Sequence, residues 1–347
     1  TITWKLPAGA EIPAIAVETS GSQEFKGWYT DSTLNNALAS GTTVTGNTTL
    51  YAKITGGAAS SGNFYDDLTH GRTATIKDQA DWETFVENAD KAVAGQLVIL
   101  GENINCTGAT YDSLSFKGNF NGNGKTISNA TFRAVDSAYY TSSENDIVCS
   151  GMFAALGAGQ IVANLTLANV TAEYASTYSA VLAGLADGTS ANPVLIQNVQ
   201  VRGGSASGRT AAGVVGFTRN TTVKYCSSIG TTITGLANGG GIVGINNAKV
   251  EFCYSTTSPT ALPSFLGGST GGVVSKKVRG GWAEFCWSTM TVVGESDSGG
   301  TDKNLLVVDA TTSVDTYETN GFTQDCWNLA VGTATTFDTS EVEYIFG

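Results

Sequence analysis

Charged residues and proline are both scarce in this chain of 347 residues. Asp, Glu, Lys and Arg make up 14% of it and proline occurs five times, whereas an average globular chain is about 25% charged. So little proline excludes collagen and proline-rich linkers. A surface this poor in charge has to be built from Thr, Ser, Asn and Gly, which form turns and tolerate strands. The composition predicts an all-β extracellular protein in preference to a cytosolic enzyme.

Long apolar runs are missing too, and so is an excess of positive charge. No stretch of about 18 apolar residues is present, so no membrane insertion is predicted. The net charge of −12 repels phosphate backbones and anionic lipid, which disfavours nucleic-acid partners. The chain opens on a strand-like stretch, residues 1–6, with no signal peptide. We therefore expect a mature protein or a fragment whose export signal has been removed.

Metal-binding and cofactor-binding patterns are absent from the sequence. His70 is the single histidine, and no Cys-x-x-Cys or His-x-x-x-His spacing accompanies it. The sequence therefore predicts no metal site and no cofactor. Weak calcium binding by loop carboxylates is an alternative that their irregular spacing disfavours. The carboxylates concerned are Glu144, Asp146, Asp297 and Asp302.

Two short patterns recur from about residue 95. The first ends in Asn or Cys, with copies spaced 27 to 40 residues apart. The second reads Gly-apolar-apolar-Gly, best at residues 213–216 and 241–244, whereas Ala180, Ala183 and Ser275 replace its glycines elsewhere. Two strand-like pieces per ~30 residues form one coil of a solenoid, since a propeller blade needs four strands in about 40 residues. We therefore predict an all-β fold, a parallel β-helix, over residues 96–347.

Stacked coils place like residues above one another, so the first pattern predicts a structural ladder. Its asparagines would bond amide to amide along the axis. Its cysteines would be reduced and buried, because stacked Cβ atoms lie ~4.8 Å apart and a disulfide needs ~3.8 Å. For Cys106 and Cys149, outside the ladder, a mutual disulfide and two free thiols both stay open. The predicted ladder is Asn129, Asn164, Asn198, Cys226, Cys253, Cys286 and Cys326.

The N-terminal part divides into a small module and a connection. Residues 1–54 hold short strands and turns, and residues 55–95 hold a Gly- and Ser-rich linker up to residue 72, followed by an amphipathic helix. Asp78 is the expected N-cap of that helix, and Trp82, Phe85, Val86 and Ala89 line one face. We expect the helix to cap the open first coil of the solenoid. The module's predicted core is Trp28, Tyr29, Leu50 and Tyr51.

Two parts of the chain resemble known families. FKGWYTD at residues 25–31 and VTGNTTLYAK at residues 44–53 are similar to the Listeria–Bacteroides repeat, the β-grasp-like B-repeat of internalins. That resemblance implies an exported stalk or spacer without chemistry of its own. Residues 213–216 and 241–244, each followed by Asn-x-x-Val-x-x-Cys, resemble the GLUG motif. That motif implies a bacterial surface protein or a non-catalytic part of an immunoglobulin-A-cleaving peptidase.

A catalytic constellation is not evident. Asp66–Asp67, the one adjacent acidic pair, lies outside the solenoid, whereas glycoside hydrolysis needs two carboxylates across the bond. Nucleophile elbows, phosphate loops and zinc-protease motifs are absent. We predict no enzyme, with a β-helix carbohydrate-active enzyme as the second alternative because such enzymes use this fold. The candidate bases for lyase chemistry are expected at scattered turns: Arg219, Lys224, Lys276, Lys277 and Arg279.

Aromatic residues follow three of the ladder cysteines, namely Tyr254, Trp287 and Trp327. If they face outward they form a strip that binds a glycan or protein ligand. If they face inward they form a core stack, and strand alternation does not decide because the ladder lies at a corner. We predict a non-catalytic, extracellular cell-surface adhesin or glycan- or host-ligand-binding protein. The first alternative is a self-associating structural subunit of a surface appendage or viral fibre.

Overall fold

The N-terminal module contains one antiparallel strand pair. In it β1 (Glu24–Tyr29) pairs with β2 (Tyr51–Thr55), with Tyr29 opposite Tyr51. The Phe25 and Trp28 rings meet edge to face, and the Lys53 ammonium lies over the Tyr29 ring. The computed structural model describes residues 9, 12, 24–31, 33, 35–43, 45, 46, 48–55, 60–136, 147–257, 259–261, 269–277, 281–284, 286–288, 323, 324, 327 and 328.

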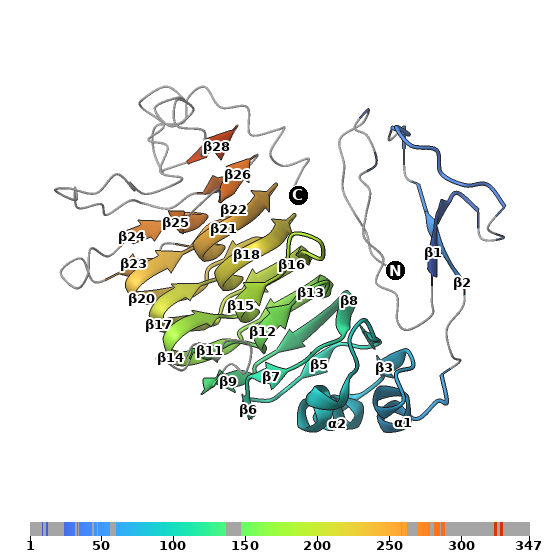
Figure 1. The fold of residues 1–347 in the computed structure, drawn as a ribbon, viewed down its shortest axis with the longest axis horizontal. Coiled ribbons are helices and arrows are strands. Elements are labelled where there is room, and N and C mark those ends of the chain that lie inside the picture. Colours follow the sequence, from blue (N-terminus) through green and yellow to red (C-terminus); the bar gives the residue numbers. More distant parts are fainter. Residues whose placement is uncertain are drawn as a thin grey trace.

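Two short helices precede the solenoid (Figure 1). The elements are α1 (Phe64–Thr69), β3 (Ala74–Ile76), α2 (Gln79–Asn88) and the 3-10 turn η1 (Ala89–Lys91). The Asp78 carboxylate caps α2 by accepting from the Asp81 N–H, as predicted. Phe85 of α2 contacts Phe116 and Phe120 of the first coils, so the helix covers the open end of the β-structure. The linker prediction for residues 55–72 was wrong where α1 lies.

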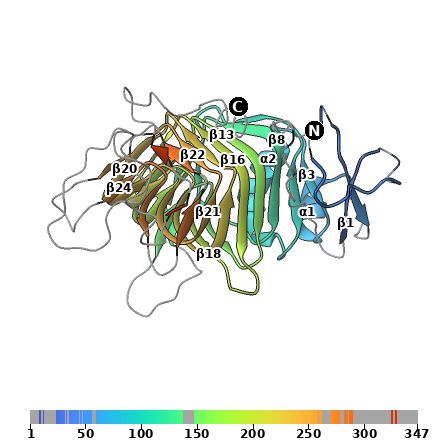
Figure 2. The ribbon, with the colours of Figure 1, turned by 90° about the horizontal axis from the view of Figure 1, so that it is seen from above.

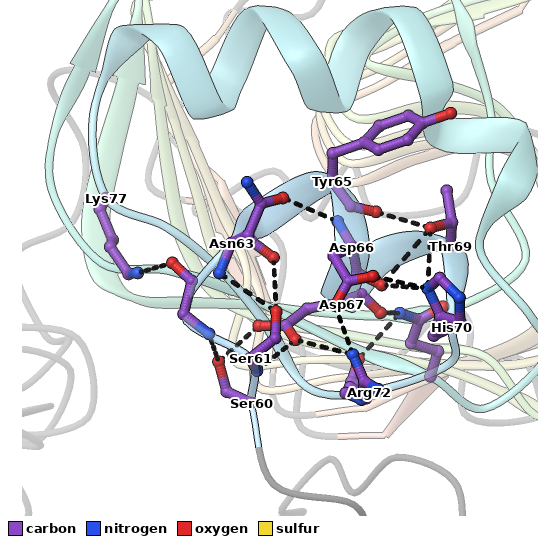
Figure 3. Close-up of polar contacts among 12 residues, drawn as sticks. Ser60, Ser61, Asn63, Tyr65, Asp66, Asp67, Thr69, His70, Arg72 and Lys77 are labelled. Atoms are coloured by element: carbon purple, nitrogen blue, oxygen red, sulfur yellow. Dashed lines mark hydrogen bonds and ion pairs between the residues drawn. The ribbon is translucent and has the colours of Figure 1, made fainter.

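A polar cluster ties the linker to these helices (Figure 3). The buried Asp67 carboxylate accepts from the Ser60 hydroxyl and, at 2.6 Å, from the Ser61 N–H. The Asp66 carboxylate forms an ion pair of 2.6 Å with Arg72. Burial alone would raise the pKa of Asp67, but these hydrogen bonds and the Arg72 charge outweigh it and lower the pKa.

The rest of the described chain winds into a stack of coils built mainly from parallel strands (Figures 1 and 2). A large sheet stacks β8, β13, β16, β18, β21, β26 and β28 in that order, and a smaller one stacks β11, β14, β17 and β20. About four turns are described along most of their length. The predicted all-β parallel solenoid with a capping helix is confirmed.

The strands have these bounds: β4 (Leu97–Leu100), β5 (Ile104–Asn105), β6 (Thr110–Asp112), β7 (Leu114–Ser115), β8 (Asn119–Ser128), β9 (Thr131–Arg133), β10 (Val135–Asp136), β11 (Val148–Ser150), β12 (Phe153–Gly157), β13 (Ile161–Ala168), β14 (Thr171–Ala180), β15 (Ala183–Asp187), β16 (Val194–Arg202), β17 (Ser205–Ala212), β18 (Val215–Lys224), β19 (Ser227–Ile229), β20 (Thr232–Gly240), β21 (Val243–Glu251), β22 (Tyr254–Ser255), β23 (Thr260–Ala261), β24 (Ser269–Gly271), β25 (Val274–Lys277), β26 (Trp282–Glu284), β27 (Trp287–Ser288), β28 (Thr323–Gln324) and β29 (Trp327–Asn328).

The asparagines form two ladders where the sequence predicted one. In the first ladder, Asn129 donates to Asn105 at 2.9 Å and Asn169 donates to Asn129 at 3.5 Å. In the second, Asn198 donates to Asn164 at 3.0 Å, and Asn164 donates to Asn121 at 3.3 Å. Asn129, Asn164, Asn169 and Asn198 all have φ between 52° and 58°, a left-handed conformation that asparagine tolerates. Each ladder therefore marks a different corner of the coil.

The cysteines form a column of their own, shifted by one residue from the predicted ladder. Because Gln197 pairs with Lys224 and Gln200 with Ser227, Cys226 lies over Val199 and not over Asn198. The Cys226 N–H points at the Cys253 sulfur, and the Cys253 N–H at the Cys286 sulfur, both at 3.4 Å. All three thiols are buried, and none of them is in a disulfide. Cys326 lies outside the described residues.

Cys106 and Cys149 are two separate buried thiols, so the disulfide left open by the sequence is not formed. Cys106 belongs to the main core, whereas Cys149 packs in a small second cluster with Ala154, Ala155 and Leu185. Burial raises the pKa of Cys106 to about 11 and that of Cys149 to about 12.

The last glycine of the Gly-apolar-apolar-Gly pattern is present in one more repeat than the sequence predicted. Ala183 pairs with Val215 and Leu185 with Phe217, so Gly184, not Ala183, is the equivalent of Gly216. A Cβ on Gly184 would lie 2.7 Å from the Cys149 Cβ, and one on Gly216 would lie 2.5 Å from the Gly184 carbonyl oxygen. Glycine is therefore required where neighbouring backbones approach closely.

The first glycine of the pattern packs against the serine that lies two residues after a cysteine. A Cβ on Gly213 would collide with the Ser228 hydroxyl, and one on Gly241 with the Ser255 hydroxyl. The Ser228 hydroxyl bonds to the hydroxyls of Thr231 and Thr257, both at 3.1 Å. The two repeat patterns thus pack against each other inside each coil.

We expect Gly216→Ala to destabilise the solenoid by about 1–3 kcal/mol, because its Cβ would overlap main-chain atoms. Chemical denaturation followed by circular dichroism measures this loss. Gly46→Ala is the matched control, since nothing lies within 4 Å of a Cβ there. Equal stability of the two variants would contradict the close-approach account.

We expect at least five free thiols per chain in unfolded, unreduced protein, because none of the five described cysteines is in a disulfide. In the folded protein Cys106 and Cys149 should react slowly at pH 8, since burial raises the pKa of both thiols. A chromogenic thiol assay with and without denaturant measures both. A count of four or fewer would show that a disulfide had been missed.

We expect Asp67→Asn to lower stability at pH 7 by about 1–3 kcal/mol, because hydrogen bonds to a charged group are lost. The pKa of Asp67 is lowered on folding, so its stabilising effect is present above the ordinary value of 3.8 and disappears as the pH falls through the folded pKa. The difference in melting temperature between parent and variant should therefore be present at pH 7 and should shrink as the pH is lowered below 3.8. The exposed Asp112→Asn is the control, and a pH-independent difference would contradict the role of the charge.

Candidate ligand-binding face

The three predicted aromatic residues stand in register on successive coils. Tyr254 on β22 pairs with Trp287 on β27, which pairs with Trp327 on β29. The Tyr254 side chain is partly exposed. The side chains of Trp287 and Trp327 lie outside the described residues, so the choice between an outward strip and an inward stack stays a prediction for them.

A second aromatic column, missed by the sequence analysis, lies across the corner. Tyr225 and Phe252 precede Cys226 and Cys253, and their rings stack with centroids 5.1 Å apart and planes inclined by 17°. Both are partly exposed, and burial raises the pKa of Tyr225. Their φ values are 55° and 51°, strained for aromatic residues, so ring stacking offsets part of the strain. We call residues 224–227 and 251–254 the cysteine corner.

Charged side chains border the cysteine corner. Lys224 and Glu251 are in register, and the Lys249 ammonium lies 2.5 Å from the Glu251 carboxylate. The Lys224 ammonium lies 6.0 Å from the centre of the Tyr225 ring and forms no ion pair with any described residue. Burial lowers the pKa of Lys224, and so does Lys249, whereas Glu251 raises it. Partial burial thus weakens the hydration of this ammonium group.

Gln197 precedes Lys224 in the same column of the large sheet. Its side chain is fully buried, and within the part of the chain that the structure describes neither its amide oxygen nor its amide nitrogen has a hydrogen-bond partner. Buried amides are nearly always satisfied, because leaving one unpaired costs about 1–3 kcal/mol. The column that contains Lys224 therefore also contains a buried amide group without a hydrogen-bond partner among the described residues.

The cations expected at scattered turns lie in strands, which corrects that prediction. Arg219 and Lys224 are in β18, and Lys276 and Lys277 are in β25; Arg279 lies outside the described residues. The Arg219 guanidinium donates two hydrogen bonds, of 2.6 and 2.7 Å, to the Asp187 carboxylate on the neighbouring coil. Burial raises the pKa of Asp187. The sequence does not show that Arg219 and Lys224 lie in one strand, because threonines and an asparagine separate them.

The polar cluster of Figure 3 contains serine, histidine and aspartate but no relay between them. The His70 Nδ1 atom lies 2.8 Å from the Asp66 carbonyl oxygen, 3.1 Å from the Asp66 carboxylate and 3.2 Å from the Thr69 hydroxyl. The hydrogen bonds that the Ser60 and Ser61 hydroxyls donate go to Asp67 and Asn63 and not to the imidazole ring. A nucleophilic serine requires that contact. The cluster is therefore a structural junction.

No group of three or more metal-binding side chains occurs among the residues the structure describes. The loop carboxylates considered for calcium, Glu144, Asp146, Asp297 and Asp302, lie outside them. Within the same described part, no helix is both long and apolar enough to cross a membrane.

Comparison with known proteins bears mainly on the first module. The family model of the Listeria–Bacteroides repeat domain matches residues 2–53. This confirms the resemblance of that module, and such repeats are typical of surface or extracellular proteins. The comparisons give no evidence for a GLUG motif. No curated protein matches the chain.

Among solved structures, the chain is similar to one described as "a putative immunoglobulin A1 protease from Bacteroides ovatus". The two are 14% identical, with a TM-score of 0.48. The alignment covers 81% of this chain and 88% of that chain.

Proposed function

We propose that this protein is a non-catalytic, extracellular cell-surface protein whose solenoid binds a carbohydrate at the cysteine corner. The observation that carries the proposal is the pair of aromatic columns on either side of the corner. Tyr225 and Phe252 form one column, and Tyr254 begins the other. The match of residues 2–53 to a repeat typical of surface proteins supports the location.

Aromatic rings beside charged groups suit sugar recognition. A ring supplies a rigid apolar surface, and a few polar groups fix orientation. Because Tyr225 and Phe252 stack on each other, their faces are largely used within the protein and their edges remain. Tyr254, on the other side of the corner, has a partly exposed side chain.

The carboxylates near the corner support a binding role over hydrolysis. Glu251 is paired with Lys249, and Asp187 with Arg219. A glycosidase needs one carboxyl group that holds a proton and a second that is free to act as base or nucleophile. Carboxylates committed to cations suit neither role, so we propose no enzymatic activity.

We expect Tyr254→Ala, and separately Trp287→Ala combined with Trp327→Ala, to weaken binding to any glycan the parent binds by at least about tenfold. A glycan array followed by titration calorimetry on the full chain measures this. Tyr174→Ala is the matched control, because Tyr174 is an exposed tyrosine on β14 with 52% of its surface accessible.

Unchanged melting temperatures would verify that the variants fold. The proposal fails if the parent binds no glycan, or if the corner variants bind as tightly as the Tyr174 control. Concentration-dependent assembly in sedimentation experiments, without glycan binding, would favour the structural subunit instead.

A further inference from the structure

Charge is strongly segregated along this acidic chain. Residues 188–283 carry eight Lys or Arg residues and one acidic residue, Glu251, which gives the stretch a net charge of +7. The whole chain has a net charge of −12, so the remainder carries −19. Residues 284–347 alone hold eleven Asp or Glu residues against one Lys. Residues 188–283 are therefore a cationic stretch, which we call the cationic band, between acidic stretches of the sequence.

Four of these cations lie on the large sheet of three successive coils. Arg219 and Lys224 are on β18, Lys249 is on β21 and Lys276 is on β25. The side chains of all four are at least partly exposed. The strand pairing places Lys224 opposite Glu251 and Lys249 opposite Thr222 on the neighbouring coils. Lys276 lies opposite Ile245, so the four charges are spread over the face of the sheet and do not form one column. Arg202 and Arg209, also exposed, lie on β16 and β17 of the preceding coil.

The local carboxylates neutralise only part of this band. Asp187 and Glu251 retain 10% and 14% of their side-chain exposure and are taken up by Arg219 and Lys249. Lys224 has no ion pair among the described residues and is partly buried beside the Tyr225 ring. Like-charged groups kept close together, with one of them partly desolvated, raise the free energy of the unliganded protein. An anionic partner would relieve that cost.

The Lys224 column also holds the unsatisfied Gln197 amide. A ligand carrying both acid groups and hydroxyls matches this combination, because acid groups accept from ammonium and amide N–H groups and hydroxyls donate to an amide oxygen. Resting on the proposed function, we infer that the carbohydrate bound at the cysteine corner is an anionic polysaccharide bearing carboxylate or sulfate groups.

A nucleic acid fits this face less well. A duplex carries one negative charge per ~1.7 Å, and its binding relies on extensive phosphate neutralisation. Here the band is flanked by segments with a combined charge of −19, and it contains the Lys249–Glu251 pair. These negative charges would repel a long, densely charged polymer more than a sparsely charged glycan.

The test compares three polymers on the full chain: polygalacturonate, neutral dextran and poly(U). Lys224→Gln combined with Lys249→Gln is the test variant. Lys91→Gln combined with Lys117→Gln removes the same charge from exposed lysines near the cap. We expect the parent to prefer polygalacturonate and the test variant to bind it at least about tenfold more weakly, with a reduced salt dependence. The control should stay within about twofold of the parent.

The other outcomes overturn the inference in distinguishable ways. Binding of dextran as tightly as polygalacturonate, with no effect of the test variant, would leave the glycan-binding function standing and remove the anionic specificity. Tighter binding of poly(U) than of polygalacturonate would show that this face binds a nucleic acid instead. Absence of binding to either polysaccharide, with no hit on the glycan array, would overturn both proposals.

Discussion

The whole solenoid depends on the register between adjacent coils, because each residue must fit the residue directly above and below it. This constraint selects glycine at Gly184 and Gly216, where a Cβ would overlap main-chain atoms of a neighbouring strand. It also selects residues that accept a left-handed backbone at the corners, such as Asn164 and Asn198. Burial of apolar side chains stabilises the coil, but these close contacts decide which residues may stack.

Much of the architecture could be predicted because that constraint leaves periodic marks in the sequence. The period, the buried cysteines and the capping helix follow from spacing and apolar patterns. The exact column does not, because Asn164 and Asn169 of one coil both adopt a left-handed backbone, at different corners. Asn164 and Asn169 lie five residues apart and belong to different ladders. The letters alone show equivalent asparagines, and only the strand pairing separates them.

The candidate face was harder to predict, for two physical reasons. Tyr225 and Phe252 adopt a backbone conformation that aromatic residues rarely take, so no propensity rule places them at a corner. The cationic band was hidden by averaging, since a chain with net charge −12 contains a stretch of +7. Charge counted over windows of a few coils would have revealed it. The facing of the Tyr254 column depends on a corner, where two-residue alternation stops being informative.

The cysteine corner shows how one fold can carry a variable surface. Inside, its chemistry is nearly constant: a cysteine, then two residues later a serine that packs against the first glycine of the other pattern, as Ser228 and Ser255 do. Beside these positions, one column changes from the buried Ser227 to the partly exposed Tyr254 and then to tryptophan on the two following coils. The neighbouring column changes from the buried Gln197 to the partly exposed Lys224 and Glu251. Stability depends on the inner positions, so the outer ones can change without disturbing the register. Aromatic and charged side chains collect on the same coils, in columns that flank a single corner. A structural requirement common to all coils does not explain that coincidence, and we propose the ligand that spans several coils as its explanation.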